Sequence, residues 1–480
     1  MRQFVDIARL PDTAYDLVII GSGFGSSFYL HRLLERKAPA RILVLEWGQH
    51  RLHDRQIADN RHSDIAPQET FRTASDKVWN FTIGLGGGTN CWFAQTPRFH
   101  PSDFRLRSLY GVGADWPIDY DELEPYYGQA EAIMAISGDE RMAAVLPRSS
   151  PFPQPPHRMS APDRLMAAAQ PDRHFAMPTA RARVATAQRS ACCASFRCSL
   201  CPVDAKFTLN NGLLHLFDHP SVDLALGAKV TRLETRGDAV VGAVVESDGS
   251  EVRVAGDRFV LGANAIHSPA ILHRSGMADP LTGAGLHETF GCNVEVLLDG
   301  VDNFDGSTIT TGLNYGLYDG EHRREGGAAL VYFDNRWTHG LRAEPGRMRQ
   351  SLPLMIVVEE AVEDSNRVSV NREGEVVVHY GGTSAYAERG QERALAKLPD
   401  LLAPLPVEDI VLRSQRPTES HLQGTLRMGN DPAASVVDAG LVHHRWRNLT
   451  VVGTSTFPTC GIANPSLTAA ALSLRAASLV

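Results

Sequence analysis

The 480-residue sequence predicts an α/β protein that combines a parallel-sheet domain with a second domain of mostly antiparallel strands and helices. Three observations support this fold class. Residues 16–46 contain two apolar runs joined by a glycine turn and a helical stretch, which is the pattern of a βαβ unit. Residues 290–415 alternate apolar and polar runs, as antiparallel strands with one buried face do. A chain of this length also exceeds one hydrophobic core, so two domains are expected.

The first segment has the features of a dinucleotide-binding unit. A strand over residues 16–20 leads into a glycine turn and a helix that runs to Arg36, and a second strand over residues 41–46 ends at Glu46. The turn reads Gly21-Ser22-Gly23-Phe24-Gly25, followed by Ser26 at the third small position of the motif. This order predicts a Rossmann-like unit that binds an ADP-ribose moiety, with an ordinary glycine turn as the alternative.

The chemistry of an ADP-ribose moiety explains these residue types. Gly21 allows the tight turn, and Gly23 lets the backbone approach a pyrophosphate at the helix N-terminus. Glu46 can accept hydrogen bonds from a ribose diol. Ser26 stands in place of Gly or Ala, so its hydroxyl is expected to crowd the helix against the strand.

A second glycine-rich segment, here called the glycine block, covers residues 83–92 and reads Ile83-Gly84-Leu85-Gly86-Gly87-Gly88-Thr89-Asn90-Cys91-Trp92. Three consecutive glycines let the backbone lie flat against a planar ligand. Aromatic residues around the block, among them Trp79 and Phe93, predict a packed site. A flexible loop is the alternative.

The remaining elements follow in chain order. Acidic residues from Asp115 onward predict the start of a helix that closes the first segment near Gly138. Residues 142–189 are rich in Pro, Ala and Arg without clear periodicity, which indicates a lid or a connection between subdomains. Strands are then expected at residues 222–226, 229–233, 239–246, 251–255, 258–263, 354–359, 367–370 and 449–453, and helices from Asn264 and from Pro465.

Composition argues against several classes of partner. The chain has 43% hydrophobic and 21% charged residues and a formal net charge of −8; its mean hydropathy is −0.18 and its isoelectric point is near 6.1. These values indicate a soluble globular protein without nucleic-acid binding, which usually needs a basic patch, and they favour a small neutral or cationic substrate. No apolar run approaches the ~20 residues of a membrane span. Residues 1–6 carry no export signal, so we expect a cytoplasmic protein.

Four of the seven cysteines lie within one short segment. They are Cys192, Cys193, Cys198 and Cys201, and Pro202 follows the last of them. In a reducing compartment, thiols and metal ligands are more common than disulfides. The C-x4-C-x2-C spacing from Cys193 is found in iron–sulfur ligand runs. Four thiolates would also suit zinc, and packed thiols at a turn are the third interpretation.

Two further motifs lie near the C-terminus and read His421-Leu-Gln-Gly424-Thr425-Leu-Arg-Met428-Gly429 and Asn464-Pro465-Ser-Leu-Thr468. By sequence rules alone, Asn464 suits a helix N-cap and Pro465 the first helical position. Together with the Gly21 turn, the glycine block, Asp115-Trp-Pro-Ile and Gly262-Ala-Asn-Ala-Ile-His-Ser-Pro, these motifs resemble the glucose-methanol-choline (GMC) flavin oxidoreductases. The likeness is greatest to the branch that contains pyranose oxidase and the flavoprotein subunits of gluconate and sugar dehydrogenases.

The resemblance implies bound FAD, which takes a hydride from a carbinol carbon at flavin N5 while a base removes the hydroxyl proton. His421 falls on the family's catalytic histidine, and Asn464 on the second member of the catalytic pair. A neutral imidazole can accept the proton, and an amide can orient the same oxygen without titrating. A helix N-terminus at Asn464 could also stabilise negative charge on a reduced flavin, so this residue is expected to contact the cofactor too.

Cys91 falls where pyranose oxidase has the histidine that links covalently to the flavin. We expect noncovalent FAD with the Cys91 thiol packed against the ring, and a thioether is the alternative. The other residues that the motifs and the resemblance assign to FAD binding are Gly21, Gly23, Phe24, Gly25, Glu46, Gly87, Gly88, Thr89, Asn90, Val230, Ala263, Gly453, Pro465 and Thr468.

We therefore expect residues 1–141, 202–289 and 425–480 to form the FAD-binding domain, and residues 142–201 and 290–424 to form the substrate domain. The expected reaction is oxidation of a CH–OH group of a sugar, polyol or glycoside. A dehydrogenase is preferred over an oxidase, because the cysteine segment resembles one that carries an iron–sulfur cluster in some sugar dehydrogenase subunits. An electron-acceptor protein or a small subunit would then be a partner.

Three other functions remain open. The first is a flavoprotein electron-transfer subunit that is inactive without partner chains. The second is an NAD-dependent dehydrogenase with the same βαβ unit, against which the glycine block argues. The third is a non-redox flavoprotein, such as an isomerase or a lyase, which no residue specifically supports.

Overall fold

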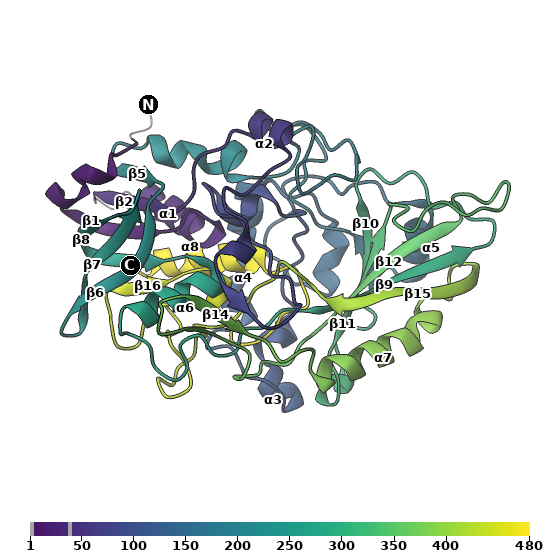
Figure 1. Cartoon of the computed structure of the whole chain (residues 1–480). Helices are drawn as coiled ribbons and strands as arrows, with labels where there is room; N and C mark the ends of the chain where they lie inside the picture. The colour runs from purple at the N-terminus through teal and green to yellow at the C-terminus, as the bar shows by residue number, and fades with distance from the viewer. Residues whose placement is uncertain (1–3, 37–40) are drawn as a thin grey trace.

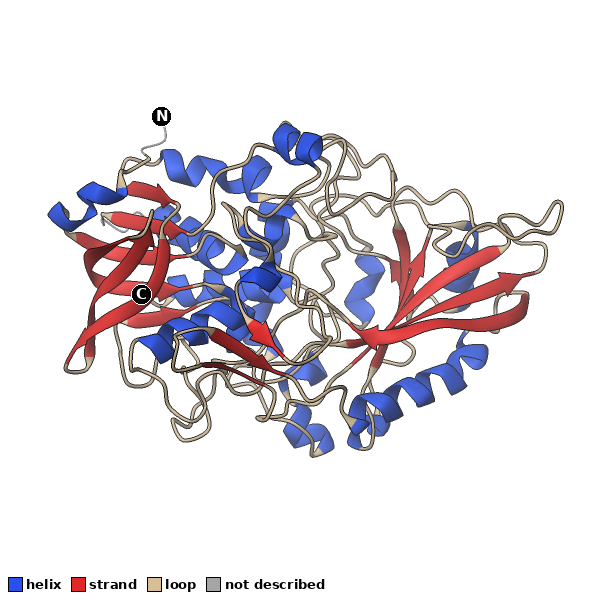
Figure 2. Cartoon of the chain, viewed as in Figure 1, coloured by secondary structure: helices blue, strands red, loops and turns tan. Residues whose placement is uncertain are grey.

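The computed structural model describes residues 4–36 and 41–480 and places two large sheets at opposite ends of the molecule (Figure 1). Helices gather around the first sheet, and long loops fill the middle (Figure 2). Residues 1–3, part of the stretch examined for an export signal, and residues 37–40 lie outside the described residues. The predicted α/β fold class is confirmed.

The first sheet has seven strands in the order β5-β2-β1-β8-β7-β6, with β16 also paired to β8. Around β1 the pairing is parallel, and the paired parts of these strands are mostly apolar and buried, as strands covered on both faces are. The strands are β1 (Tyr15–Ile20), β2 (Ile42–Glu46), β5 (Val222–Leu226), β6 (Lys229–Arg236), β7 (Ala239–Ser247), β8 (Ser250–Leu261) and β16 (Leu449–Val451).

β8 differs from the prediction, because residues 251–255 and 258–261 belong to one continuous strand rather than to two, and the strand ends before Gly262. Its first half pairs antiparallel with β7, and its second half pairs parallel with β1. A Cβ on Gly256, between the halves, would lie 2.8 Å from Val18 Cγ2. Gly256 therefore marks a close approach to β1 rather than the end of a strand.

Three helices pack together beside the parallel strands: α1 (Phe24–Glu35), α4 (Tyr120–Met134) and α8 (Ser466–Ser478). α8 contacts both α1 and α4 and is buried along nearly its whole length, as its largely apolar sequence requires. Asp119 caps α4 by accepting the Glu122 N–H at 2.8 Å, which confirms the predicted capping by acidic residues.

The second sheet has six strands in the order β15-β9-β12-β11-β10-β4, and each neighbouring pair is antiparallel. Helix α7 (Ala385–Leu401) packs on β11 and β12. The strands are β4 (His174–Ala176), β9 (Phe290–Leu298), β10 (Thr310–Asn314), β11 (Ala329–Asp334), β12 (Ser351–Val358) and β15 (Val407–Pro417). The antiparallel pairing predicted for residues 290–415 is thus present.

Two regions differ from the prediction. Residues 142–189, for which no element was predicted, contain β4 and the helix α5 (Ala161–Ala169), whose capping box joins Ser160 and Asp163. Strand β13 (Arg367–Val370) does not join the six-stranded sheet. It pairs with β14 (Val376–His379), which pairs with β3 (Arg72–Thr73), and these form a separate three-stranded sheet.

The remaining helices are shorter. Helix α6 begins at Asn264 as predicted, and the Asn264 side chain accepts the Ile266 and His267 N–H groups at 2.8 and 3.0 Å. The other helices are α2 (His53–Asp59), α3 (Leu106–Tyr110) and α6 (Asn264–Arg274), with short 3-10 or π turns at Ile7–Asp12, Pro67–Glu69, Gly87–Asn90, Pro101–Phe104, Glu140–Ala144, Leu209–Leu213, Leu214–Asp218, Glu321–Arg324 and Thr454–Thr456. Within the described part of the chain, no helix has the length and apolar character needed to cross a bilayer.

Candidate active site

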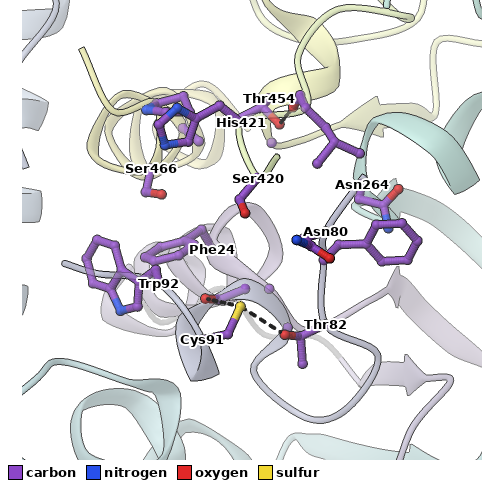
Figure 3. A pocket seen from close by; sticks show the side chains of 18 of the residues that line it. Phe24, Asn80, Thr82, Cys91, Trp92, Asn264, Ser420, His421, Thr454 and Ser466 are labelled. Carbon is purple, nitrogen blue, oxygen red and sulfur yellow. Dashed lines mark hydrogen bonds between the residues drawn. The ribbon is translucent and has the colours of Figure 1, made fainter. Parts of the chain in front are cut away.

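A cavity of about 870 Å³ lies where the two large sheets face each other. One wall carries the turn after β1, the end of β2, the glycine block and the start of α8, and the other carries side chains of β9, β11, β12 and β15. Figure 3 shows His421, Ser420 and Thr454 across the cavity from Cys91 and Thr82. The cavity therefore joins both predicted functional regions.

The turn after β1 has the shape that a pyrophosphate site requires. Gly21 has a φ of +88°, and a Cβ there would lie 2.5 Å from Gly262 O. A Cβ on Gly25 would lie 2.7 Å from Gly453 N, whereas nothing lies within 4 Å of that position on Gly23. The cavity side of Gly23 is thus open, and the first turn of α1 can present its N–H groups and positive dipole end to an anion.

Ser22 connects the two glycine segments to the acidic residue. Its hydroxyl donates to Glu46 Oε2 at 2.5 Å and accepts the Gly86 N–H at 2.9 Å. Glu46 Oε1 accepts the Gly48 N–H at 3.0 Å. Burial raises the pKa of the Glu46 carboxyl, and these hydrogen bonds oppose that change. Glu46 lines the cavity at the end of β2, and its bond to Ser22 was not foreseen from the sequence.

Most of the predicted FAD contacts line the cavity, and three do not. Thr89 Oγ1 accepts the Leu209 N–H at 3.0 Å, and Asn90 Nδ2 donates to Leu85 O at 2.9 Å. The Thr468 hydroxyl pairs with a tyrosine of α4 at 2.8 Å. Thr89 and Asn90 thus bond backbone groups and Thr468 joins α8 to α4, and none of the three lines the cavity. The lining includes Gly21, Gly23, Phe24, Gly25, Glu46, Gly87, Gly88, Cys91, Val230, Ala263, Gly453, Asn464 and Pro465.

Cys91 lies on the wall formed by the glycine block. The Thr82 hydroxyl donates to Cys91 Sγ at 3.1 Å, and Sγ lies 3.8 Å from Gly88 O (Figure 3). Phe24 and Trp92 pack edge to face with ring centroids 4.7 Å apart. A Cβ on Gly88, like one on Gly23, would meet nothing within 4 Å. The open backbone, the acidic residue and the aromatic wall fit a flavin dinucleotide.

The two residues predicted to be catalytic lie together on the wall of the cavity. Asn464 Nδ2 donates to His421 Nε2 at 3.2 Å, although 43 positions separate the residues. His421 follows β15 and is half-buried, and its Nδ1 is a buried atom with no hydrogen-bond partner among the described residues. Nε2 and the amide are bonded to each other here, so a substrate oxygen that contacted both groups would replace this bond.

The Asn464 side chain does not cap α8, contrary to the prediction. The helix begins at Ser466 with Pro465 in the cap position, and the described chain supplies no side-chain cap. Asn464 Oδ1 instead accepts the Tyr332 hydroxyl at 3.1 Å, and Nδ2 donates to Gln95 Oε1 at 3.4 Å. An uncapped helix N-terminus therefore reaches the cavity, where its dipole favours negative charge.

A buried ion pair lies beside His421. Lys77 Nζ and Glu288 Oε2 are 2.7 Å apart, and their side chains are only 3% and 1% exposed. Glu288 Oε1 accepts the His421 backbone N–H at 2.7 Å and the Thr418 hydroxyl at 2.8 Å. Desolvation lowers the pKa of His421, Glu288 opposes this change and Lys77 adds to it. The imidazole is therefore neutral at physiological pH and able to accept a proton.

The wall from the six-stranded sheet presents polar side chains that the sequence did not identify. Asn293, Arg336 and Arg416 line it. Arg336 forms an ion pair with Asp334, and Arg416 forms one with Glu419 at 2.8 Å. Such a wall donates and accepts hydrogen bonds without a large net charge. Alternation of apolar and polar residues reveals strands, but it does not say which residues face a cavity.

The four clustered cysteines do not form the predicted ligand set. Cys198 and Cys201 are buried, Cys192 is half-buried and Cys193 is exposed. Within residues 4–36 and 41–480, no three or more His, Cys, Asp or Glu side chains are grouped as ligands for a metal ion. Cys192 Sγ lies 3.7 Å from Thr308 Oγ1. Burial raises the pKa of the Cys198 thiol, and Cys192 and Cys201 add to this change, so these three thiols lie near one another without being grouped as metal ligands.

The cysteine segment nevertheless lies next to the glycine block. Lys206 Nζ donates to Asn90 O at 2.9 Å and to Ser199 O at 2.8 Å, so one buried ammonium group joins the two segments. Burial lowers the pKa of Lys206 to about 8, and Cys91 is the first group that opposes this change. Thiols of the segment therefore lie close to the wall that Cys91 contributes.

Comparisons with known proteins agree with this site. Two models of the GMC oxidoreductase family match residues 110–293 and 359–473, together more than half of the chain. The fructose dehydrogenase large subunit of Gluconobacter japonicus is 27% identical, over 97% of this chain and 97% of the relative. The 6'''-hydroxyparomomycin C oxidase of Streptomyces lividus is 28% identical, over 97% and 91%. The paromamine 6'-oxidase of Streptomyces fradiae is 28% identical, over 98% of this chain and 92% of the relative.

The structure of pyridoxine 4-oxidase from Mesorbium loti superposes with a TM-score of 0.69 over 97% of this chain and 98% of that chain. The two sequences are 20% identical, so this similarity shows the fold alone.

Proposed function

We propose, since the chain belongs to the GMC oxidoreductase family, that it oxidises a CH–OH group of a sugar, polyol or glycoside. As a member of that family it is an FAD-dependent oxidoreductase that acts on CH–OH donors. The observation that carries the proposal is the contact between His421 Nε2 and Asn464 Nδ2 at 3.2 Å, on the wall of the cavity that also contains Glu46 and the glycine turn.

Each part of the cavity has a proposed role. The first turn of α1 would hold the pyrophosphate, and Glu46 would hold the ribose. Bound FAD would accept the hydride from the substrate carbon. His421 Nε2 accepts the hydroxyl proton, and Asn464 Nδ2 donates to the same oxygen and orients it. The N-terminus of α8 would stabilise negative charge that accumulates next to it.

The proposed substrate class rests on the polar wall of the cavity. Asn293, Gln95 and the paired Arg336 and Arg416 can bind several hydroxyl groups at once. The relatives include a fructose dehydrogenase and a paromamine 6'-oxidase, and both names imply carbohydrate-like substrates for those proteins. A simple alcohol would leave most of these groups without a partner, and unpaired buried polar groups weaken binding.

We propose noncovalent FAD and a dehydrogenase rather than an oxidase. The half-buried Cys91 thiol already interacts with Thr82 and Gly88, so it can pack against the flavin as a small apolar group. The preference for a dehydrogenase rests on the fructose dehydrogenase relative, whose name describes a large subunit. A protein or a small subunit would then take the electrons.

Anaerobic titration tests the proposal. The purified yellow protein is mixed with a panel of sugars, polyols and glycosides while the visible flavin band is followed, and air is then admitted. Bleaching by at least one carbohydrate, with slow recovery in air, supports a sugar dehydrogenase. Fast recovery would make the protein an oxidase. Absence of bleaching with every alcohol would contradict CH–OH oxidation by the isolated chain.

A second candidate is an electron-transfer subunit that depends on partner chains. The observation that favours it is the position of the cysteine segment, which Lys206 joins to the glycine block. The cysteines of this segment, all of them among the described residues, are not grouped as metal ligands. Analysis of anaerobically purified protein for iron and acid-labile sulfide tests this candidate, and their absence would remove the iron–sulfur version of it.

A further inference from the structure

We propose that a chain of hydrogen bonds from Asp334 to His421 determines which nitrogen of the His421 ring carries the proton. This chain, here called the relay, passes through Thr310, Gln95 and Asn464, and its longest link is 3.4 Å. The inference rests on the proposed role of His421 as the base, because a base must offer an unprotonated nitrogen to the substrate hydroxyl.

The first link follows from the register of the six-stranded sheet. Thr310 of β10 lies directly opposite Asp334 of β11, and Thr310 Oγ1 donates to Asp334 Oδ1 at 2.7 Å. Both side chains are buried, so little water competes for this bond. Tyr332 lies two positions before Asp334 on the same strand, and alternate side chains of a strand project from one face. Tyr332 and Asp334, which act on the Asn464 amide directly and through the relay, therefore project from the same face of β11.

The carboxylate sets the direction of the next bonds. Asp334 forms an ion pair with Arg336, so it accepts hydrogen bonds and Thr310 must donate to it. The Thr310 oxygen is then free to accept from Gln95 Nε2, which lies 2.8 Å away. Gln95 consequently turns its Oε1 toward Asn464, whose Nδ2 donates to it at 3.4 Å.

A second bond, outside the relay, fixes the position of the Asn464 amide oxygen. The Tyr332 hydroxyl donates to Asn464 Oδ1 at 3.1 Å, and desolvation raises the pKa of Tyr332, so the phenol keeps its proton. With its oxygen engaged by Tyr332, the amide presents Nδ2 to His421 Nε2 at 3.2 Å. An N–H donor facing Nε2 requires that Nε2 be unprotonated, so the ring proton resides on Nδ1. The reversed amide would place a carbonyl against Nε2 and hold a proton there.

The charged groups closest to His421 act separately from the relay. Glu288 bonds the His421 backbone N–H rather than the ring, and Lys77 pairs with Glu288. These two charges change how readily the ring gains a second proton. The relay instead determines which nitrogen is free in the neutral ring, so the two effects can be measured independently.

The test replaces a buried threonine that does not line the cavity. Thr310→Val keeps the shape and removes the hydroxyl, so Gln95 loses its acceptor and only the Tyr332 hydroxyl still sets the direction of the Asn464 amide. A phenol hydroxyl can accept as well as donate, so the reversed amide becomes accessible. Thr310→Ser keeps a hydroxyl and should restore the relay. Thr311→Val is the matched control. It removes an adjacent buried hydroxyl that donates a hydrogen bond to Phe333 O and takes no part in the relay.

The first readout is the anaerobic rate of flavin reduction by substrate in the FAD-loaded protein. Thr310→Val should slow this rate about fivefold to tenfold, which is the usual effect of one lost hydrogen bond. The substrate concentration for half-maximal rate should change little. Thr310→Ser and Thr311→Val should stay within about twofold of the wild type, as expected when no relay bond is lost. An equal loss in all three variants would assign the effect to packing and overturn the inference.

The second readout does not depend on turnover. Nitrogen-15 NMR of histidine-labelled protein, with His421→Gln to identify the signal, reports which ring nitrogen is protonated. The wild type should carry the proton on Nδ1, and Thr310→Val should show both tautomers. A protonated Nε2 in the wild type, or an unchanged signal in Thr310→Val, would overturn the inference. The expected tautomers without flavin reduction by any alcohol would support the relay and reject the proposed function.

Discussion

Loss of Glu288 or of Lys77 should shift the pH dependence of flavin reduction in opposite directions. Glu288 raises the pKa of His421, and Lys77 lowers it. Glu288→Gln should therefore lower the pKa of His421, so the neutral, active imidazole persists at lower pH and the acid limb of the pH profile moves to lower pH. Lys77→Met should raise the pKa of His421, so the acid limb moves to higher pH. A single nearby charge should change the pKa by about one unit, which corresponds to about 1.4 kcal/mol.

The burial of the pair determines the size of the accompanying stability change. The charged atoms are 2.7 Å apart, and the side chains are 3% and 1% exposed, so either single substitution leaves a buried charge without its partner. Breaking such a pair costs about 3–5 kcal/mol. The double variant Lys77→Met/Glu288→Gln leaves no buried charge at this place. It should therefore unfold at a higher denaturant concentration than either single variant.

Two assays check these expectations. Stopped-flow anaerobic reduction across a pH series locates the acid limb, and urea unfolding of the FAD-loaded protein measures stability. Asp302→Asn is the control, because its partner Arg349 and Asp302 are 45% and 37% exposed and such pairs contribute little. Shifts of the acid limb in one direction for both single variants, or a double variant less stable than both, would refute the reasoning.

Four further outcomes are expected. His421→Ala should reduce turnover about 10²–10⁴-fold with the bound flavin spectrum unchanged, and near-normal turnover would reject its role as the base. Gly21→Ala should lower the free energy of unfolding by at least about 1–3 kcal/mol, because φ is +88° and the new Cβ would lie 2.5 Å from Gly262 O. Gly23→Ala should fold normally and bind FAD weakly in a flavin-release assay, since its Cβ enters open space; equal unfolding losses at both glycines would contradict this. Acid precipitation should release the yellow colour, and colour retained by the wild type but lost in Cys91→Ser would establish a thioether.

Local sequence patterns were sufficient to predict the elements that depend on contacts between residues close together in the sequence. The turn from Gly21 to Gly25, the strand ending at Glu46 and the capping of α4 by Asp119 all depend on residues a few positions apart. Hydrophobic runs and glycine chemistry report such contacts directly. The antiparallel sheet was predictable for the same reason, because alternation reflects one buried face.

Contacts between distant segments were not predictable in this way. Tyr332 and Gln95 are 132 and 369 positions from Asn464, and no sequence rule links them. Asn464 was expected to cap a helix because Asn commonly does so, but three partners from other segments hold its side chain instead. The capping box at Ser160 was a local signal for α5 that could have been read.

The predicted cysteine ligands illustrate a different limit. Spacing describes how far apart residues lie along the chain, whereas ligation requires side chains that converge. Cys193 faces solvent while Cys198 and Cys201 are buried, and no pattern of letters distinguishes these orientations. The strand at residues 367–370 was predicted, but the sheet that it joins was not. Alternation of apolar and polar residues indicates a strand and does not identify its pairing partners.

The position of β1 has a consequence for how the chain folds. β1 pairs on one side with β2, which follows it closely, and on the other with β8, where Tyr15 meets Gly256. Until residues 250–261 arrive, the strand that precedes the glycine turn has an exposed, apolar edge open to intermolecular pairing. Parallel pairing between such distant segments is also slow to form. Low expression temperature and an ample supply of FAD during synthesis should therefore increase the fraction of chains that reach the native state without aggregating.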